Sequence, residues 1–557
     1  VEHHKVSRDH KIYTITAPTG IGKTYTAIGL AHRLRAMLSG NRKIVYSLPF
    51  TSIIDQNFSE IEAIMKWSLA SNLEENPGVY LYKHHHLSSI ILEAEEGNDS
   101  NQSIDFSNYL KNQILYESWD SGTIVSTFVQ LFESLIGVRN KWLKKFHNIV
   151  NSVIILDEIQ NLPAKYHNLV GEVFQILADR FDTYIIFMTA TQPNIIDSSR
   201  SVPLVDTDKY FNHEIFNRVN VNVINNIEAF SHEDVQKHVE NNHLNDSILF
   251  VCNTKKCTIQ LFNKISEIAS NEAVCFCLTT LQTPRDREKI IESIEKNLLD
   301  GKQVICVSTQ LIEAGVDISF PVVYRDLGPL DSIIQVAGRC NRNGEYGNKG
   351  QLYITSLVND NGKTYANLVY DTILIQNTRT ILLESDNIFD SSQFLDMSEK
   401  YFDKFDFEYL SKKHLKAIKN LEYSEAKNSK STPVKKFKLI EDRPNECEVV
   451  ICQTSKDENR LKELFEAYKK LKTKSFEDDD YQSTMGYIKY LRKELAEITI
   501  TVYEYMLDNY LDSLGLVQDD ELDIYYVPYE YYLEDQIYKE DIGWNINPDN
   551  TARVETF

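Results

Sequence analysis

The stretch from Ile12 to Thr24, IYTITAPTGIGKT, limits the possible folds of this chain more than any other. An apolar, β-branched run ends in a Gly-rich turn, and Lys23, Thr24 and a helical pattern follow. This is the order of strand, phosphate-cradling loop and helix that a P-loop requires. Ala17 stands where the motif begins with Gly, so the form is A-x-T-G-x-G-K-T. A purely structural Gly-rich turn is the alternative, but the intact G-K-T between a strand and a helix favours a nucleotide-phosphate site.

Each part of the predicted loop has its own chemical task. Glycines let the backbone curl so that its N–H groups point at phosphate oxygens. Lys23 would reach the β and γ phosphates, and the Thr24 hydroxyl would hold Mg²⁺. The predicted nucleotide-binding residues of the loop are Thr19, Gly20, Ile21, Gly22, Lys23 and Thr24.

Length and composition indicate a globular protein of several domains. At 557 residues the chain is too long for one core, and we expect three or four domains. No apolar run approaches the roughly 18 residues of a membrane span, and residues 1–10 are too polar for a secretory signal, so we expect a cytoplasmic protein. The eight Cys are scattered and predicted to be reduced. The net charge of −22 argues against non-specific capture of duplex DNA, although a local basic groove is still possible.

Apolar strands alternate with amphipathic helices in two successive series. This pattern predicts two α/β domains, each with a parallel sheet covered by helices on both faces. The second series starts near Arg218 and contains no second P-loop. After the P-loop, the first series has strands within Lys43–Pro49, Thr123–Gly137, Ser152–Gln160 and Thr183–Pro193; those of the second are Ser247–Thr254, Ala273–Thr279, Gln303–Thr309, Pro321–Leu327 and Gly350–Thr355.

Beyond residue 358 the pattern changes. Residues 363–425 are expected to be mostly helical, and Lys427–Lys436 resembles a linker. The remainder is acidic and Tyr-rich, with helices predicted near Asn459–Lys472 and Tyr487–Leu507 and no catalytic constellation. The predicted domains are residues 1–212 and 213–357, both α/β, then a helical linker at 358–440 and an acidic C-terminal domain at 441–557.

Asp157 and Glu158 end the apolar strand SVIILDEIQ. In a P-loop protein the first carboxylate binds Mg²⁺, so Thr24 and Asp157 are the predicted metal ligands. Glu158 would orient and deprotonate the attacking water. A D-E pair at a strand end is often only a cap or solvated surface, but here it is coupled to a P-loop. The other acid- and metal-like cluster, His84 to His86, has no companion ligands nearby and is not expected to bind metal.

Gln335, Arg339 and Arg342 recur at i, i+4 and i+7 in QVAGRCNRNG, which predicts one face of one or two helical turns. Two guanidinium groups and an amide on one face suit a polyphosphate whose charge grows in the transition state. Arg339 and Arg342 would then be arginine fingers. The alternative is a pair of surface arginines engaged in ion pairs.

Before this cluster stands STQLIEAGVDISF, with Glu313, Gly315 and Asp317. In chain order the motifs are therefore a P-loop, D-E-x-Q, T-A-T and Q-x-x-G-R-x-x-R. This order resembles that of superfamily 2 helicases over about 340 residues. The resemblance implies two tandem RecA-like domains with ATP in the cleft between them, an ATP-hydrolysing helicase, and nucleotide contacts from Gly315 and Asp317.

A narrower resemblance is to the CRISPR-associated helicase of type I systems. It rests on DEIQ with Gln160, on Thr189–Pro193, on STQLIEAGVDISF and on Gly338–Glu345. The resemblance implies an ATP-dependent 3′→5′ translocase on single-stranded DNA. It would be recruited by the crRNA-guided surveillance complex (Cascade) to the displaced strand of the R-loop, and would carry a C-terminal accessory domain.

Two departures from that family are visible. The segment Asp286–Ile290 matches, but the preceding TTLQ differs from the usual His-Ser-containing form. The family also has an N-terminal HD nuclease domain, whereas no HD dipeptide precedes the P-loop here. DNA degradation would therefore need an HD nuclease domain that is separate or removed, and we expect this chain to lack it.

Contacts to DNA are predicted at strand ends, because hydroxyls, amides and backbone N–H groups there bind phosphates without reading bases. Strand-end capping is the alternative for each residue. Thr189 and Thr191 would link the nucleotide site to the DNA track. The predicted DNA contacts are Ser47, Thr51, Thr127, Asn253, Ser308 and Thr309.

Two other functions are compatible with these motifs. One is a superfamily 2 DNA or RNA helicase outside CRISPR. The other is a helicase-like scaffold that binds nucleotide as a switch, although the intact Lys23, Glu158, Arg339 and Arg342 argue for hydrolysis.

Overall fold

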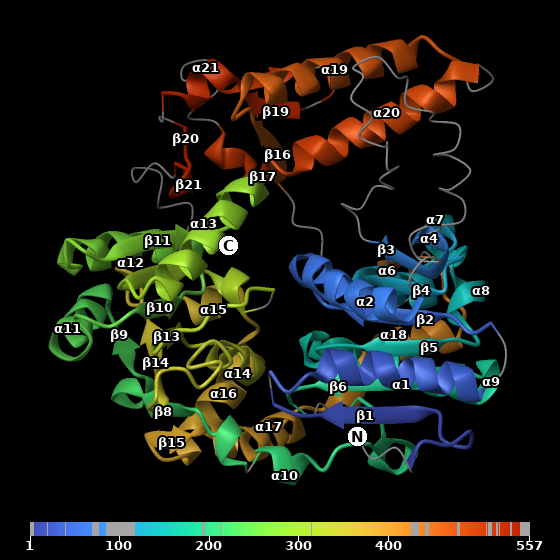
Figure 1. The fold of residues 1–557 in the computed structure, drawn as a ribbon, viewed down its shortest axis with the longest axis horizontal. Helices are drawn as coiled ribbons and strands as arrows, with labels where there is room; N and C mark the ends of the chain where they lie inside the picture. The colour runs from blue at the N-terminus through green and yellow to red at the C-terminus, as the bar shows by residue number, and fades with distance from the viewer. Residues whose placement is uncertain are drawn as a thin grey trace.

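Two α/β domains lie side by side, and a C-terminal domain extends over both of them (Figure 1). In the described part of the chain no helix is long and apolar enough to cross a membrane. The computed structural model describes residues 5–18, 20–38, 41–69, 77–84, 117–191, 195–211, 213–313, 315–424, 434–440, 445–475, 479–507, 510, 515–519, 522, 524–534 and 537–545.

The first domain is built on a seven-stranded sheet in which every strand pair is parallel. Neighbouring residues of one strand belong to different cores: Ile154 packs on one side of the sheet and Ile155 on the other. Burying such a side chain contributes about 1.5–3 kcal/mol, so both faces need helices. The strands, in sheet order, are β3 (Leu81–His84), β4 (Thr123–Thr127), β2 (Ile44–Leu48), β5 (Val153–Leu156), β6 (Tyr184–Thr189), β1 (Ile12–Thr16) and β7 (Val202–Pro203). The covering helices are α1 (Lys23–Met37) and α2 (Ile54–Leu69) on one face, and α6 (Phe128–Ile136) and α9 (His167–Phe181) on the other.

The second domain repeats this design with seven strands in one continuous order. Its cores again alternate, since Leu249 and Phe250 pack on opposite faces. Two of these seven strands were not predicted: β8, in which Asn alternates with Val, and β15, which has only three residues and pairs antiparallel. The order is β11 (Val274–Leu278), β12 (Val304–Ser308), β10 (Ile248–Val251), β13 (Val322–Asp326), β14 (Gly350–Leu357), β8 (Val219–Val223) and β15 (Ile388–Asp390).

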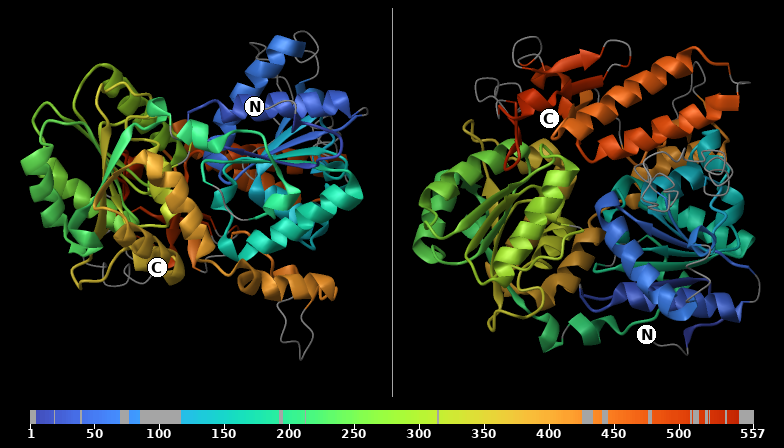
Figure 2. Two further views of the ribbon diagram at one scale, coloured as in Figure 1. Left: turned by 90° about the horizontal axis from the view of Figure 1, so that it is seen from below. Right: turned by 45° about the horizontal axis from the view of Figure 1, so that its top comes forward.

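The segment after β14 is mostly helical, as predicted, and is divided between the two domains. Helices α16 (Thr372–Glu384) and α17 (Phe394–Asp403) bury Ile381 and Tyr401 in the core of the second domain. Helix α18 (Phe407–Lys419) then returns to the first domain, where Ala417 joins the core beneath α9. Figure 2 shows this crossing, with the orange helices of the segment running from one domain to the other. The segment therefore connects the two α/β domains before the chain enters the C-terminal domain.

The C-terminal domain combines a four-stranded sheet with two long helices, α19 (Ser455–Lys472) and α20 (Asp479–Ala496). The predicted helix Tyr487–Leu507 is wrong at its C-terminal end, because the β-branched residues of Thr499–Tyr503 form strand β17 instead. Leu281 of the second domain is part of this domain's core, and its carbonyl accepts a hydrogen bond from Trp544 N. The sheet order is β17, β16 (Glu446–Ile451), β19 (Ile524–Val527) and β18 (Val517–Asp519).

Candidate nucleotide site between the two α/β domains

The phosphate loop connects buried β1 to α1. Ala17 N donates to Thr189 O at 3.1 Å, which fixes the start of the loop beside β6. Gly20 and Gly22 have φ values of 78° and 83°, in the left-handed region that favours glycine. Helix α1 begins at Lys23 with neither a side-chain cap nor an acidic residue in its first turn. Its free N–H groups and helix dipole therefore suit a phosphate, while Thr19 lies outside the described residues.

Lys23 and Thr24 start α1 and face the strands of the sheet. The Lys23 ammonium donates to Ala17 O at 3.0 Å, within the loop itself. The Thr24 hydroxyl contacts Asn57 Oδ1 at 3.4 Å, and the same oxygen lies 3.4 Å from the Tyr46 hydroxyl. A polar chain thus leads from the loop toward the neighbouring strand end.

Asp157 and Glu158 follow β5 directly. Tyr46 donates its hydroxyl proton to Asp157 Oδ2 at 2.6 Å, so the polar chain from Thr24 ends on this carboxylate. Burial, followed by the charge of Glu158, raises the pKa of Asp157, while the nearby Lys23 opposes that rise. Glu158 has φ 51°, and its backbone N–H bonds to Asp157 Oδ1 at 2.9 Å, so the second carboxylate points in a different direction from the first.

The residues present fit Mg²⁺. A hydroxyl and a carboxylate supply hard oxygen ligands, and Mg²⁺ is held in such sites by one or two protein oxygens, water and substrate phosphates. Among the described residues no group of three or more His, Cys, Asp or Glu side chains is placed to hold a metal ion.

A second polar chain connects the strand ends of β5 and β6. Gln160 donates from Nε2 to Glu158 Oε2 and accepts at Oε1 from the Thr189 hydroxyl at 2.6 Å. Thr191 N donates to the Thr189 hydroxyl at 2.9 Å. A change in the position of the Glu158 carboxylate would therefore alter the hydrogen bonds of Thr189 in the T-A-T segment.

The second domain supplies the opposite side of the site. Helix α14 (Leu330–Ala337) ends before the arginines, so the prediction that Gln335, Arg339 and Arg342 share a helical face is wrong. Both arginines lie in the turn after the helix, where Asn341 has φ 46°. Across the cleft, Gln335 Nε2 donates to Asn161 Oδ1 of the first domain at 3.2 Å.

Both arginines are engaged within their own domain. The buried Arg339 donates to the carbonyls of Ile312 at 3.0 Å and Glu313 at 2.9 Å. Burial and then the charge of Arg342 lower the pKa of Arg339 to about 9, and Glu158 is close enough to counter that effect. Arg342 Nε pairs with Asp317 Oδ1 at 2.9 Å. Gly315, with φ 83°, precedes this acid in the same loop.

The strand-end residues predicted to contact DNA are mostly buried. Thr127 caps α6, accepting from Gln130 N at 3.2 Å, which is the capping alternative. Asn253 uses both amide atoms inside its domain: Oδ1 accepts from Arg325, and Nδ2 donates to Asp326. The buried side chains of this set are Ser47, Thr127, Asn253, Ser308 and Thr309, whereas Thr51 is half-buried. Their roles in DNA contact stay predictions.

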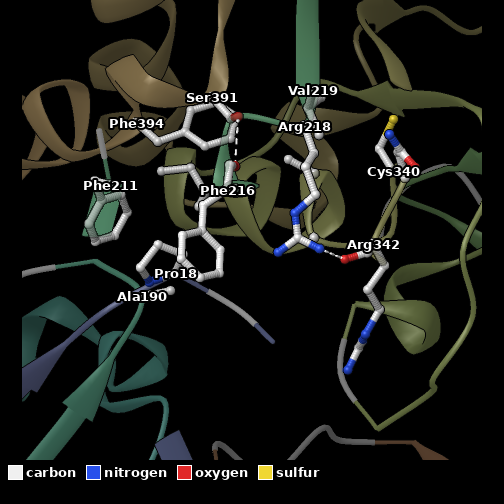
Figure 3. Close-up of a pocket in the computed structure, with 14 residues that line it drawn as sticks. Pro18, Ala190, Phe211, Phe216, Arg218, Val219, Cys340, Arg342, Ser391 and Phe394 are labelled. Atoms are coloured by element: carbon white, nitrogen blue, oxygen red, sulfur yellow. Dashed lines mark hydrogen bonds between the residues drawn. The ribbon is translucent and has the colours of Figure 1, made fainter. Parts of the chain in front are cut away.

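Several residues of the site were not identified from the sequence. Tyr46 and Asn57 complete the polar chain from Thr24 to Asp157 in the first domain, although neither belongs to a nucleotide-binding motif. Arg218 precedes β8 and lines a pocket with Pro18 of the phosphate loop (Figure 3). The only sequence signal for Arg218 is its place at the start of the second strand series.

Two family models match the chain at the two walls of the cleft. The model described as type III restriction enzyme, res subunit, matches residues 2–194, which contain the phosphate loop. The model described as CRISPR-associated nuclease/helicase Cas3, C-terminal, matches residues 245–345, which contain both arginines.

Curated relatives share the same name. The CRISPR-associated nuclease/helicase Cas3 of Haloferax volcanii is 29% identical over 448 residues, covering 62% of this chain and 46% of the relative. That of Streptococcus thermophilus is 22% identical over 371 residues, covering 59% of this chain and 39% of the relative. The chain thus spans less than half the length of these relatives.

Solved structures show the same fold over nearly the whole chain. T. fusca Cas3 superposes with a TM-score of 0.64 at 14% identity, covering 92% of this chain and 65% of that one. A chain of the structure titled CRISPR RNA-guided surveillance complex, pre-nicking, superposes with a TM-score of 0.54 at 15% identity, covering 92% and 64%.

Tandem RecA-like domains, with a phosphate loop on one wall and paired arginines on the other, resemble the arrangement of the ATP-dependent helicases of superfamily 2. The motifs, the family models and the curated relatives agree on a narrower group. That group is the Cas3 family of CRISPR-associated nuclease/helicases, to which this chain is similar.

Proposed function

We propose that this chain is an ATP-dependent translocase that moves 3′→5′ on single-stranded DNA during type I CRISPR interference. ATP binds in the cleft between the two α/β domains, and the crRNA-guided surveillance complex delivers the displaced strand of its R-loop. Relatives named Cas3 support the family setting, and the likeness to a chain of a surveillance complex supports the partner. DNA degradation requires a nuclease centre in addition and is not part of the proposal.

The observation that carries the proposal is the division of the site between two walls. Lys23 and Asp157 come from the first domain and Arg339 and Arg342 from the second, and the Gln335–Asn161 hydrogen bond already joins the walls at 3.2 Å. Such a site is complete only when the cleft closes, so that hydrolysis is coupled to a domain movement.

The residues have distinct proposed roles in hydrolysis. Lys23 and the loop N–H groups hold the phosphates, and Glu158 orients a water molecule and takes its proton as the oxygen attacks the γ-phosphorus. The bond between the γ-phosphorus and the β–γ bridging oxygen breaks, leaving ADP and phosphate. Bound through Thr24 and Asp157, Mg²⁺ supplies charge neutralisation at the phosphates.

The arginines must change partners for this to happen. Arg342 would leave Asp317, and Arg339 would leave the carbonyls of Ile312 and Glu313, to meet the growing phosphate charge. Release of phosphate would restore those intradomain contacts. The cycle therefore alternates between two sets of arginine partners, which supplies the opening and closing of the cleft.

The test is ATP turnover by the full chain with single-stranded DNA, duplex DNA or single-stranded RNA. Single-stranded DNA should stimulate turnover most, and Lys23→Ala should reduce the stimulated rate to background. The matched control is Lys264→Ala, which removes a partly exposed lysine paired with Glu233 in the second domain. Equal stimulation by RNA would favour a helicase outside CRISPR, and near wild-type turnover in Lys23→Ala would disprove the site.

Polarity and recruitment have separate readouts. A 3′→5′ translocase should displace streptavidin from a strand biotinylated at its 5′ end but not at its 3′ end. Binding should be tighter to an R-loop held by a purified type I surveillance complex than to the same displaced sequence in a protein-free bubble. Displacement from the 3′ end, or equal binding to both DNAs, would contradict these parts of the proposal.

A further inference from the structure

Arg218 lies at the junction of the two domains, directly before β8. It lines the pocket in Figure 3 together with Pro18 and Ala190 of the first domain and Arg342 of the second. Pro18 belongs to the phosphate loop and Ala190 to the T-A-T segment. The pocket therefore adjoins the nucleotide site, and Arg218 itself belongs to no motif identified in the sequence.

The guanidinium of Arg218 is held in place from two sides. Its Nη1 donates to the carbonyl oxygen of Arg342, and its Cζ lies 5.4 Å from the centroid of the Phe216 ring. Its Nη2 reaches the phosphate loop, since a Cβ built on Gly20 would lie 4.0 Å from that nitrogen. A cation from the second domain is thus fixed beside the loop that cradles phosphates.

The local charges are not balanced. Burial and the nearby Arg342 both lower the pKa of Arg218, which means that the site disfavours its charge. Arg342 has Asp317 as an ion-pair partner at 2.9 Å, whereas no carboxylate among the described residues pairs with Arg218. A half-buried cation beside a second cation is costly unless an anion joins them.

We propose that Arg218 binds the γ-phosphate of the nucleoside triphosphate held by the phosphate loop. The proposal rests on the proposed function, because it assumes that the loop binds a triphosphate. A guanidinium presents a planar set of donors that matches phosphate oxygens, and Arg218 Nη2 lies 4.0 Å from the position of a Cβ built on Gly20 of the phosphate loop. Arg342 is proposed to meet the γ-phosphate, and its carbonyl holds Arg218 at the same end of the nucleotide.

This assignment gives the nucleotide a direct contact with the first strand of the second domain. Arg218 is one residue from Val219, where β8 begins, and β8 pairs along β14 through residues 350–354. A triphosphate would therefore hold the phosphate loop and the second sheet together through one side chain. A diphosphate would lose that link, so Arg218 distinguishes the two nucleotide states.

The experiment compares the equilibrium affinities of the full chain for a non-hydrolysable ATP analogue and for ADP. Arg218→Gln should weaken binding of the analogue about tenfold to a hundredfold, as expected for a charge-assisted hydrogen bond. ADP binding should change by at least tenfold less. Arg218→Lys should recover part of the lost affinity, and Arg200→Gln, an exposed arginine paired with Asp179, should change neither. Unchanged analogue binding in Arg218→Gln, or equal losses for both nucleotides, would overturn the assignment.

A double-mutant cycle with Arg342→Gln separates a phosphate contact from an indirect effect. If Arg218 touches the nucleotide, Arg218→Gln should still lose affinity for the analogue in the Arg342→Gln background. If it only supports the Arg342 turn, the second substitution should cause no further loss, which would refute the proposal. Thermal unfolding without nucleotide verifies that each variant is folded.

Binding and hydrolysis fail independently, so the two proposals can be told apart. Tight analogue binding that depends on Arg218, in a chain that does not hydrolyse ATP with DNA, would disprove the proposed function and leave the Arg218 contact standing. DNA-stimulated hydrolysis with no effect of Arg218→Gln on analogue binding would do the opposite.

Discussion

The two α/β domains share one strand order but differ at the helix that follows the sixth strand of each sheet. In the first domain that strand is β1, and α1 starts beside Gly22 without a cap or an acidic residue. In the second domain it is β8, and the next helix, α11 (His232–Asn242), has a capping box formed by Ser231 and Asp234. Uncapped N–H groups attract an anion, whereas a capping box has already satisfied them. The same architecture therefore yields one phosphate site instead of two.

A second difference concerns the carboxylate at the end of the fourth strand. Asp157 follows β5 and receives a side-chain hydrogen bond from Tyr46 beside the phosphate loop. Asp326 ends β13 and accepts from Asn253 Nδ2 at 2.6 Å and from Leu357 N at 2.8 Å. Burial raises the pKa of both groups. The two acids thus have different hydrogen-bond donors, and only Asp157 is joined by such a contact to the polar chain that starts at Thr24 of the phosphate loop.

Asp157→Asn should give the largest effect, a fall in DNA-stimulated ATP turnover of about 10³-fold or more, because an amide cannot replace the carboxylate at Mg²⁺. The matched substitution Asp326→Asn places an amide N–H against existing donors. It should lower the free energy of unfolding by about 1–3 kcal/mol and leave most of the turnover. Steady-state hydrolysis and thermal unfolding measure both. Similar losses of turnover in the two variants would remove the distinction between the domains.

Gly22→Ala should rank second. At φ 83° a Cβ is strained, although no heavy atom lies within 4 Å, so the loop would have to change its backbone. We expect nucleotide affinity to fall by about tenfold to a hundredfold, since several loop N–H groups turn away together. Gly301→Ala is the control, with φ 70° and equally open space in the second domain. Gly301→Ala should lower the free energy of unfolding by about 1 kcal/mol and leave the nucleotide affinity unchanged.

The first wall of the site could be predicted from the sequence because its chemistry is local. A strand, a Gly-rich turn and G-K-T occupy adjacent positions, and the apolar runs of β5 and β6 place Asp157 and Thr189 at one sheet edge. The contacts of Arg218 with the loop depend instead on how two domains meet. Arg339 and Arg342 were assigned as phosphate ligands from their spacing, yet their partners here are Ile312, Glu313 and Asp317.

Errors in the predicted fold have similar causes. Strand β8 alternates Val with Asn and β15 has three residues, so neither resembles the continuous apolar runs of their neighbours. The helix predicted through Leu507 followed a strong helical pattern into Thr499–Tyr503, where pairing with β16 decides the structure. Strand pairing outweighed a weak local preference in β8 and β15, whereas the β-branched residues of Thr499–Tyr503 also favour a strand locally.

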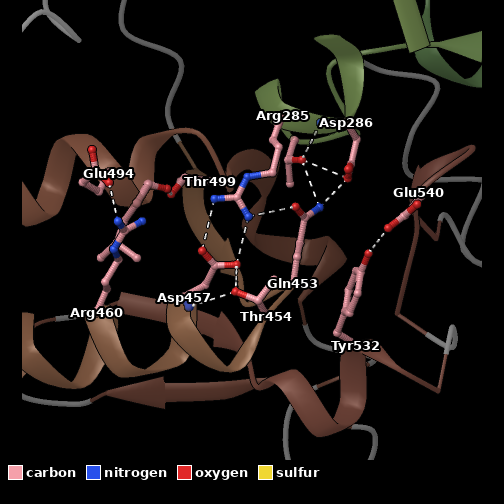
Figure 4. Close-up of polar contacts among 12 residues, drawn as sticks. Arg285, Asp286, Gln453, Thr454, Asp457, Arg460, Glu494, Thr499, Tyr532 and Glu540 are labelled. Atoms are coloured by element: carbon pink, nitrogen blue, oxygen red, sulfur yellow. Dashed lines mark hydrogen bonds and ion pairs between the residues drawn. The ribbon is translucent and has the colours of Figure 1, made fainter. Parts of the chain in front are cut away.

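The two α/β domains also differ in how they contact the C-terminal domain, which makes buried polar contacts with the second domain (Figure 4). Arg285 Nη1 pairs with Asp457 at 2.9 Å, and Asp457 is 4% exposed. Asp457→Asn should lower the free energy of unfolding by about 2–3 kcal/mol, a discounted value for breaking a partly buried pair. The exposed pair of Asp396 with Lys400 is the control, and Asp396→Asn should cost less than about 0.5 kcal/mol.

The loss of stability caused by Asp457→Asn should depend on pH, and it should become smaller as the pH falls. Burial opposes ionisation of Asp457, but hydrogen bonds from Arg285 and Thr454 outweigh it and lower its pKa. A carboxylate with a lowered pKa stabilises the fold above its unfolded pKa of about 3.9, and that contribution is lost as the pH falls through the folded value. The difference between wild type and Asp457→Asn should therefore be full at pH 7 and shrink below about pH 4. A difference that grew on acidification would contradict this origin.

Ser231→Ala should have the smallest effect on stability and activity. It tests directly whether the capping box of α11 is what distinguishes the second domain from the first. Ser231 Oγ accepts from Asp234 N at 3.2 Å, so its loss exposes N–H groups at the start of α11 and should cost about 1 kcal/mol in the free energy of unfolding. Nucleotide affinity and turnover should stay at the wild-type level, because Glu233 and Asp234 keep negative charge at that helix end. Isothermal titration with the ATP analogue should still find one site per chain. A second site in Ser231→Ala would mean that the cap alone prevents phosphate binding, whereas one site means that the glycine loop is also required.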